Sequence, residues 1–352
     1  MNMRKTLPGG WEAAIFAGAG AITGTLIAAN LRRNGRSISL TDRVVVITGG
    51  SRGLGLALAH EFGCAGASLV LAARDSDELN RAKELLLQHN AVRSAEDVLL
   101  VECDLSKPLA AAGLIERATG HFGKVNVLVN NASLIHLGPI EQQPMEAFRE
   151  SMEVGYFAMV EATKAVLPQM LGRRNGSIVN IASVGGKMPV PHLAPYCGTK
   201  FAAVGFSETL HAEVRSKGVH VTTVCPGLMR TGSFPNALVV GDLEKEYAWF
   251  ATSAAMPGLS NSAERAARKI FRAAVEGRTE ITIGPETALA ARLHGIAPAV
   301  SQFLAHLAED LLLPEPNGES NITPARSIAP PRSRLFRILT RSLTAPHNEP
   351  AP

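Results

Sequence analysis

Short apolar runs alternate with longer amphipathic segments along most of the chain. Seven runs rich in Val, Ile and Leu predict buried parallel strands, because such strands lack the polar alternation of a half-exposed sheet. They lie at residues 43–50, 67–74, 97–105, 124–133, 176–183, 219–227 and 278–284. Longer segments between them predict helices, at residues 54–66, 78–90, 145–171 and 194–218. The alternation predicts an α/β fold: a doubly wound parallel sheet of seven strands with helices on both faces.

The pattern also divides the chain into parts. The sheet and its helices are expected within residues 40–285, and residues 286–313 predict a helical extension. Residues 314–352 are rich in Pro, Ser and Asn, which predicts a largely disordered tail. Within this tail, residues 333–344 gather arginines on one helical face and leucines on another. Two interpretations stay open, a membrane-surface helix or an unstructured segment, since short isolated helices are marginal in water.

Residues 13–31 form a run of nineteen residues without a charge. As a helix this run would span about 28 Å, close to the roughly 30 Å of a bilayer core. Arg32, Arg33 and Arg36 follow the run and outnumber the basic residues before it. Basic residues favour the cytoplasmic side, so residues 1–39 predict an anchor that leaves the large domain facing the cytoplasm. A cleaved signal peptide and a glycine-rich surface helix are the alternatives.

Charge and cysteine content narrow the classes of partner. Of the net charge of +4, the basic excess lies in residues 1–43 and 314–352, and the stretch between them is acidic overall. A nucleic-acid-binding protein usually carries its basic patch on the folded domain, so an anionic membrane surface is the better partner. The four cysteines stand far apart and show no disulfide or metal-ligand spacing, which predicts reduced thiols and no metal site.

The segment Thr48–Gly55, TGGSRGLG, directly follows the first apolar run and opens a helix. Its letters GGSRG match the nucleophile elbow of a serine hydrolase, with Ser51 as the nucleophile. Gly49, Gly53 and Gly55 also match a phosphate-binding turn between a strand and a helix. The position after the first strand favours a dinucleotide site, because a hydrolase elbow needs several strands before it and an acid and a histidine after it.

Further motifs follow at the strand ends, and as a set the chain resembles the short-chain dehydrogenase/reductase family from about Leu40 to Gly284. The matching residues are Thr48, Gly49, Gly53 and Gly55; Asp104 and Leu105; Asn130, Asn131 and Ala132; Ser183, Tyr196 and Lys200; and Pro226, Gly227 and Thr231. The resemblance implies a Rossmann fold, a nicotinamide cofactor and the interconversion of carbonyl and alcohol groups.

By this resemblance Ser183, Tyr196 and Lys200 are the catalytic residues. Tyr196 and Lys200 stand four apart, so they share one helical face. A free tyrosine has a pKa near 10, and a nearby ammonium lowers the pKa of the phenol. Tyr196 is therefore expected to exchange a proton with the substrate oxygen, while Ser183 holds that oxygen by a hydrogen bond.

The resemblance also assigns the cofactor contacts. They are Gly49, Ser51, Arg52, Gly53, Leu54, Gly55, Arg74, Asp104, Leu105, Asn131, Ala132, Tyr196, Lys200, Pro226, Gly227 and Thr231. Ala73 stands where members that prefer NAD carry an acidic residue, and Arg74 follows it. Two guanidinium groups, of Arg52 and Arg74, suit a 2′-phosphate, so NADP(H) is the expected cofactor.

Gly155 departs from the family pattern, which has Asn there to help hold a water that leads protons to the lysine. The departure keeps open an alternative function, an NADP(H)-binding protein of low turnover. Residues 228–257 are expected to form the substrate lid, and their aromatic residues suit an apolar substrate. The sequence thus predicts an NADP(H)-dependent oxidoreductase for a hydrophobic carbonyl or alcohol, and a homo-oligomer stays open.

Overall fold

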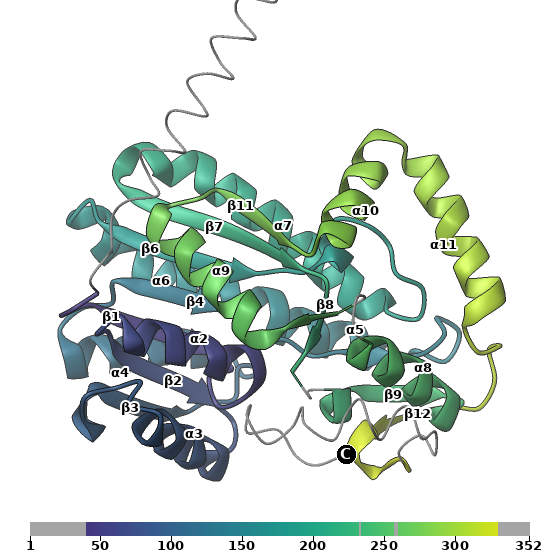
Figure 1. Cartoon of the computed structure of the whole chain (residues 1–352), viewed down its shortest axis with the longest axis horizontal. Coiled ribbons are helices and arrows are strands. Elements are labelled where there is room, and N and C mark those ends of the chain that lie inside the picture. Colours follow the sequence, from purple (N-terminus) through teal and green to yellow (C-terminus); the bar gives the residue numbers. More distant parts are fainter. Residues whose placement is uncertain (1–39, 232–233, 257–259, 330–352) are drawn as a thin grey trace, which may run out of the picture. The chain divides into compact units, whose positions relative to one another are not determined.

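A seven-stranded parallel sheet forms the centre of the fold (Figure 1). The computed structural model describes residues 40–231, 234–256 and 260–329. The strands run in the order β11-β7-β6-β4-β1-β2-β3. They are β1 (Val44–Thr48), β2 (Ser68–Ala73), β3 (Val98–Glu102), β4 (Val127–Asn130), β6 (Gly176–Ile181), β7 (Val219–Pro226) and β11 (Glu280–Ile283). The prediction of a doubly wound parallel sheet of seven strands is confirmed.

Helices cover both faces of this sheet because alternate residues of each strand point to opposite sides. Val45 and Ile47 pack in one apolar core, and Val44 and Val46 pack in the other. The first core is closed by α2 (Gly53–Cys64), α3 (Ser76–Gln88) and α9 (Ala263–Glu276). The second is closed by α4 (Ala110–Phe122), α6 (Ala158–Gly172) and α7 (Ala194–Val214).

The strand order reverses beside β1, whose neighbours are β2 on one side and β4 on the other. Ligands of open α/β sheets bind in the crevice at such a switch point, outside the carboxyl ends of the strands. The residues that follow β1 and β4 therefore meet at the place where a dinucleotide would bind.

A smaller three-stranded sheet forms beside the main one and corrects the prediction of a disordered tail. Its strands are β5 (His136–Leu137), β9 (Leu238–Gly241) and β12 (Glu319–Pro324). The strand β12 pairs antiparallel with β9, and the Ala325 N–H donates to the Ala237 carbonyl at 2.8 Å. Backbone pairing and the burial of Ala325 and Ile328 order a segment whose composition alone predicts disorder.

The predicted lid, residues 228–257, contains β8 (Leu228–Arg230), β9 and α8 (Leu243–Ala255), and β8 pairs with β10 (Ser260–Ser262). From the sequence, its aromatic residues either suit an apolar substrate or pack in the core. The structure buries Phe234, Tyr247 and Phe250 in a core with Ala325 and Ile328. These side chains hold the lid to the C-terminal segment, and only the edge of this core reaches Tyr196.

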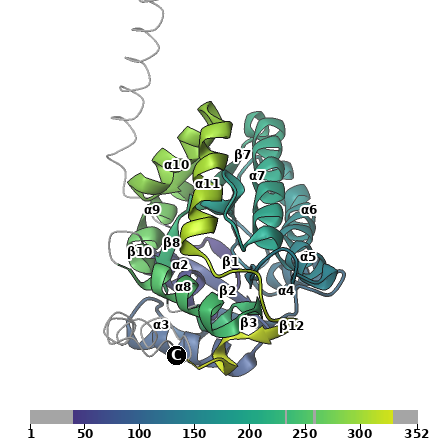
Figure 2. The same ribbon diagram turned by 90° about the vertical axis from the view of Figure 1, so that its right-hand side faces the viewer.

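The predicted helical extension is confirmed as a hairpin of α10 (Pro285–Ile296) and α11 (Pro298–Leu312), which Figure 2 shows side by side. The predicted anchor, residues 1–39, and the predicted amphipathic segment, residues 333–344, lie outside the described residues. Within the described ranges, none of the helices combines the length and the apolar character that crossing a bilayer requires.

Candidate active site

The glycine turn after β1 has the geometry of an anion-binding turn. Gly49 and Gly53 have φ angles of +63° and +54°, which side chains rarely allow. A Cβ at Gly55 would collide with the Gly49 carbonyl oxygen, so the turn closes only with glycine there. The helix α2 begins at Gly53, and the side chain of its first flanking residue, Arg52, does not cap it. Uncapped N–H groups at a helix start suit a phosphate, so the turn fits a dinucleotide.

Asn131 and Ala132 brace this turn from the end of β4. The backbone N–H groups of both residues donate to Thr48 Oγ1, at 2.9 and 3.1 Å. The Asn131 side-chain amide donates to the carbonyls of Thr48 and Gly49, both at 3.0 Å. Asn131 is predicted as a cofactor contact, but both hydrogens of its side-chain amide are used in hydrogen bonds that stabilise the turn.

Ser51 and Arg52 both bond to one carboxylate, that of Glu78 on α3. Arg52 Nη1 lies 2.7 Å from Glu78 Oε1, and Ser51 Oγ donates to Glu78 Oε2 at 3.1 Å. Ser51 is buried, and its hydroxyl donates its one hydrogen to this acid, whereas a serine nucleophile donates that hydrogen to a histidine base. A nucleophilic serine needs such a base, so the arrangement does not support the serine hydrolase.

Two further predicted cofactor residues lie at the ends of β2 and β3. Arg74 follows β2 and is exposed. Asp104 follows β3, and its Oδ1 accepts from the backbone N–H and the hydroxyl of Ser106, at 3.0 and 2.8 Å. Burial raises the pKa of Asp104, but the hydrogen bonds from Ser106 and the charges of Arg74 and Lys107 together lower it by more. The pKa of Asp104 therefore lies below its ordinary value, and the carboxylate stays ionised.

Leu54 and Leu105, also predicted as cofactor contacts, have buried side chains. Any contact that they make with a cofactor is therefore through the backbone or the edge of the side chain.

Ser183, Tyr196 and Lys200 converge at the carboxyl end of β6. Ser183 follows β6, and its Oγ accepts from the Gly185 N–H at 3.1 Å. Lys200 is buried, and its Nζ donates to the Ile181 carbonyl at 2.9 Å. The same Nζ lies 5.5 Å from the centroid of the Tyr196 ring, within the range of a cation–π contact. The structure thus brings the three predicted catalytic residues together.

Burial shifts the proton affinities of this group. Desolvation raises the pKa of Tyr196 to about 12, although a hydrogen bond with Ser183 lowers it in part. Desolvation lowers the pKa of Lys200 to about 8, against a smaller rise from Cys225. At neutral pH the phenol therefore keeps its proton and the lysine is largely charged.

The remaining predicted cofactor residues follow β7. The Gly227 N–H donates to the Ile283 carbonyl at 3.2 Å, and a Cβ at Gly227 would collide with Thr287 of α10. Pro226 ends the strand, and Thr231 is buried, with its N–H bonded to the Met229 carbonyl at 3.0 Å. These residues lie at the border of the site, next to the first turn of α10, where the α10–α11 hairpin begins.

Gly155 lies where the long predicted helix departs from α-helical geometry. The segment Glu153–Phe157 is a turn of π-helix between α5 (Met145–Met152) and α6. A Cβ at Gly155 would lie 2.5 Å from Thr199 Cγ2, and the Thr199 hydroxyl is fixed by its bond to the Pro195 carbonyl at 2.9 Å. The methyl group of Thr199, the residue before Lys200, therefore fills the space beside Gly155.

The structure also shows a buried cluster that motif spacing did not suggest. His192 Nδ1 lies 2.8 Å from Glu246 Oε1, and Trp249 Nε1 donates to Glu246 Oε2 at 2.8 Å. His192 precedes α7 with a φ of +61°, while Glu246 and Trp249 belong to α8. The cluster ties the lid to the segment that leads into Tyr196. The 54 positions between His192 and Glu246 explain why no local signal revealed it.

Comparison with known proteins identifies the family. The short chain dehydrogenase family profile matches residues 43–237. "Dehydrogenase/reductase SDR family protein 7-like" of Anopheles gambiae is 34% identical over 79% of this chain and 82% of its own length. "Dehydrogenase/reductase SDR family member 7" of Homo sapiens is 33% identical over 58% of this chain and 60% of its own. The chain belongs to the short-chain dehydrogenase/reductase family and is an oxidoreductase of that class.

Solved structures show the same fold. A short-chain dehydrogenase from Streptomyces avermitilis aligns with a TM-score of 0.64 and 25% identity, over 78% of this chain and all of its own. A metagenomic short-chain oxidoreductase in complex with NADP aligns with a TM-score of 0.56 and 26% identity, over 70% of this chain and 99% of its own.

The packing of Thr199 on Gly155 predicts a coupled pair. Gly155→Ala should lower the free energy of unfolding by about 1–3 kcal/mol, because the new methyl overpacks against Thr199. Thr199→Ser removes that methyl and keeps the hydroxyl, so it should recover most of the loss in the double variant. Urea unfolding of the two single variants and the double variant measures the coupling. A loss in the double variant equal to the sum of the two single losses would show that the two residues are independent.

Proposed function

We propose that the protein interconverts a hydrophobic carbonyl and its alcohol with NADP(H), using Tyr196 as the proton donor and acceptor. The observation that carries the proposal is the convergence of Ser183, Tyr196 and Lys200 at the switch-point side of the sheet. Ser183 orients the substrate oxygen, and Tyr196 transfers the proton. The charge of Lys200 stabilises the phenolate that remains after the transfer.

In the reduction of a carbonyl, Tyr196 is the proton donor. With a pKa of about 12, Tyr196 holds its proton at neutral pH and is ready to give it to a substrate oxygen. The bound cofactor supplies or accepts the hydride. The protein's part is to orient the oxygen, provide the proton and hold the Lys200 ammonium beside the phenol.

The preference for NADP(H) rests on the basic residues near β2. The Glu78 carboxylate already neutralises Arg52. Arg74, by contrast, is exposed and forms no ion pair within the described residues. Arg74 is therefore the better candidate to bind a 2′-phosphate. The residue before it is Ala73, so no carboxylate at that position would repel the phosphate. The relative solved with NADP is consistent with this choice.

The location proposed is a membrane surface with the catalytic domain in the cytoplasm. Support comes from the uncharged run at residues 13–31 and the arginines that follow it. A hydrophobic substrate dissolves in the same phase that this run would enter.

Arg74→Ala should weaken NADPH binding and leave NADH binding nearly unchanged. The lost charge-assisted bond is worth about 1.5–3 kcal/mol, or roughly tenfold to a hundredfold in the dissociation constant. Fluorescence titration with each cofactor measures the effect, and Arg93→Ala, another exposed arginine, is the matched control. Equal weakening for both cofactors would remove this role from Arg74.

The pH profile of carbonyl reduction should follow Lys200. Its pKa in the fold is about 8, below the ordinary value, so the ammonium is lost as the pH rises through about 8. The rate should be flat from about pH 6 to about pH 7.5 and then fall, because a neutral lysine no longer stabilises the phenolate. Stopped-flow turnover at saturating NADPH measures the profile. A rate that rises through pH 8 would contradict this role of Lys200.

Tyr196→Phe tests the function itself. The variant should lose turnover of every member of a panel of apolar ketones by at least about a hundredfold, since no other group donates the proton. NADPH binding, measured by fluorescence, should change little. Normal turnover in this variant would refute the mechanism. Cofactor binding by the unchanged protein without any product would favour the alternative of low turnover.

A further inference from the structure

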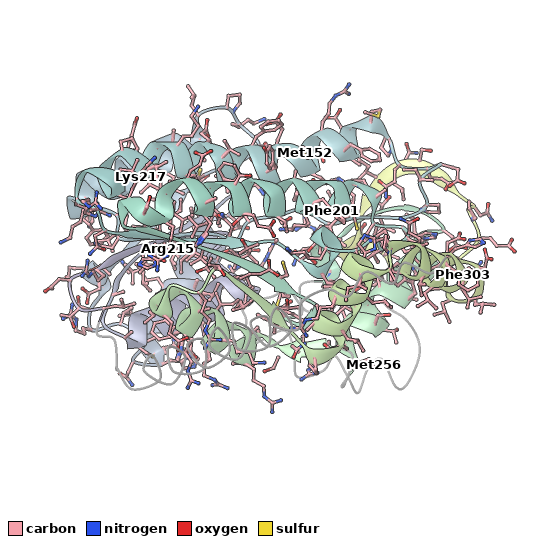
Figure 3. The ribbon with its side chains drawn as sticks, turned by 90° about the horizontal axis from the view of Figure 1, so that it is seen from above. Met152, Phe201, Arg215, Lys217, Met256 and Phe303 are labelled. Atoms are coloured by element: carbon pink, nitrogen blue, oxygen red, sulfur yellow. The ribbon has the colours of Figure 1, made fainter. Side chains whose placement is uncertain are left out.

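Large apolar side chains are exposed along the α10–α11 hairpin. Their exposed fractions range from 41% to 85%, and they are Leu289, Ile296, Val300, Phe303, Leu304, Leu307, Leu311 and Leu312. Figure 3 shows Phe303 at the outer edge of the molecule. Soluble domains rarely leave such a concentration of apolar side chains to water unless it binds something.

The helix α11 presents three different faces. One packs on α10 through Ser301, whose hydroxyl lies 2.6 Å from His294 Nδ1. A second carries Gln302, His306 and Asp310 and is polar and exposed. The third is an exposed apolar stripe whose members follow at helical spacing: Val300, Phe303, Leu304, Leu307 and Leu311. The stripe contains no charged residue and extends about 17 Å along the helix.

The root of the hairpin borders the active site. The first turn of α10 holds Thr287 against Gly227, at the carboxyl ends of β7 and β11. The hairpin that carries the stripe is therefore joined to the domain at the edge of the proposed site.

We propose that the apolar stripe of α11, with Leu289 and Ile296 of α10, docks on the surface of a lipid bilayer. This goes beyond the proposed anchor, and it rests on the proposed function for the identity of the substrate and for the insertion of residues 13–31. An amphipathic helix with an uncharged apolar stripe and a separate polar face is the form that lies in a membrane interface.

The chain outside the described domain also favours lipid. Eight residues separate the uncharged run, residues 13–31, from Leu40. Fully extended, this connection spans at most about 30 Å, so an inserted run keeps the domain near the bilayer. The tether raises the local concentration of lipid at the hairpin, and the apolar contact of the hairpin adds its own attachment. Docking would bring a substrate dissolved in lipid to the edge of the site.

Vesicle flotation of a version that starts at Ser39 tests the docking without the run 13–31. The version keeps the fold, because the main sheet and its cores lie within residues 40–329. Neutral phosphatidylcholine vesicles at about 0.5 M salt exclude attraction by the basic tail, since salt screens exposed charges. We expect the protein to float with the vesicles.

Substitutions then identify the surface responsible. Leu311→Ser should lower the partition to vesicles about tenfold, and the double variant with Phe303→Ser about a hundredfold. Each substitution removes an apolar side chain that the proposal places in the bilayer. The matched control is Leu109→Ser, at a leucine of similar exposure, 74% against 70%, at the start of α4; it should change nothing. Thermal unfolding confirms that all variants remain folded.

Two results would overturn the proposal. One is that the version starting at Ser39 stays in the aqueous phase. The other is that light scattering shows a dimer that Leu311→Ser converts to a monomer, since a second copy would then cover the stripe. Turnover of a water-soluble ketone by the same version is measured separately. Loss of turnover with flotation intact would refute the proposed function and leave the docking standing.

Discussion

The hydrogen bonds between Thr48 and the Asn131–Ala132 segment connect the two halves of the sheet at its switch point. Through them the end of β4 fixes the turn after β1, and the turn in turn sets where α2 begins. Because the turn already has its backbone shape, little conformational freedom remains to be lost when a phosphate binds. The catalytic group on α7 is held in a comparable way, since the Lys200 ammonium bonds to the end of β6.

The main sheet was accessible from the sequence because buried parallel strands must be apolar on both faces. Runs such as Val44–Thr48 therefore stand out, and the glycines after them mark the turn. The short strands β5 and β12 were not accessible. His136–Leu137 is too short to show a period, and Glu319–Pro324 is polar and contains proline, so their pairing arises only from tertiary contacts with β9. The aromatic residues of the predicted lid are a similar case. The sequence shows that they are apolar, but not that they pack against the C-terminal segment.

The predicted catalytic residues meet in space because the elements that carry them were correctly placed. What the motifs did not convey is their surroundings. Gly155 looked like the loss of a functional asparagine, yet the structure shows it as the partner of Thr199, 44 positions later, at a π-turn. Burial likewise reverses the simple expectation for Tyr196, whose pKa lies above its ordinary value even though Lys200 is near. Desolvation is the largest cause of this shift and outweighs the lowering of the pKa by the hydrogen bond with Ser183.

The three-stranded sheet of β5, β9 and β12 has a consequence for the order in which the molecule is built. Its strands come from three distant parts of the chain, near residues 136, 238 and 319. Domains form as the chain emerges from the ribosome, beginning at the amino-terminal side. The glycine turn and its brace are complete once Ala132 has emerged, whereas the small sheet waits for the last tenth of the chain. During synthesis the residues of the glycine turn and of its brace are therefore all present long before β12 can pair with β9.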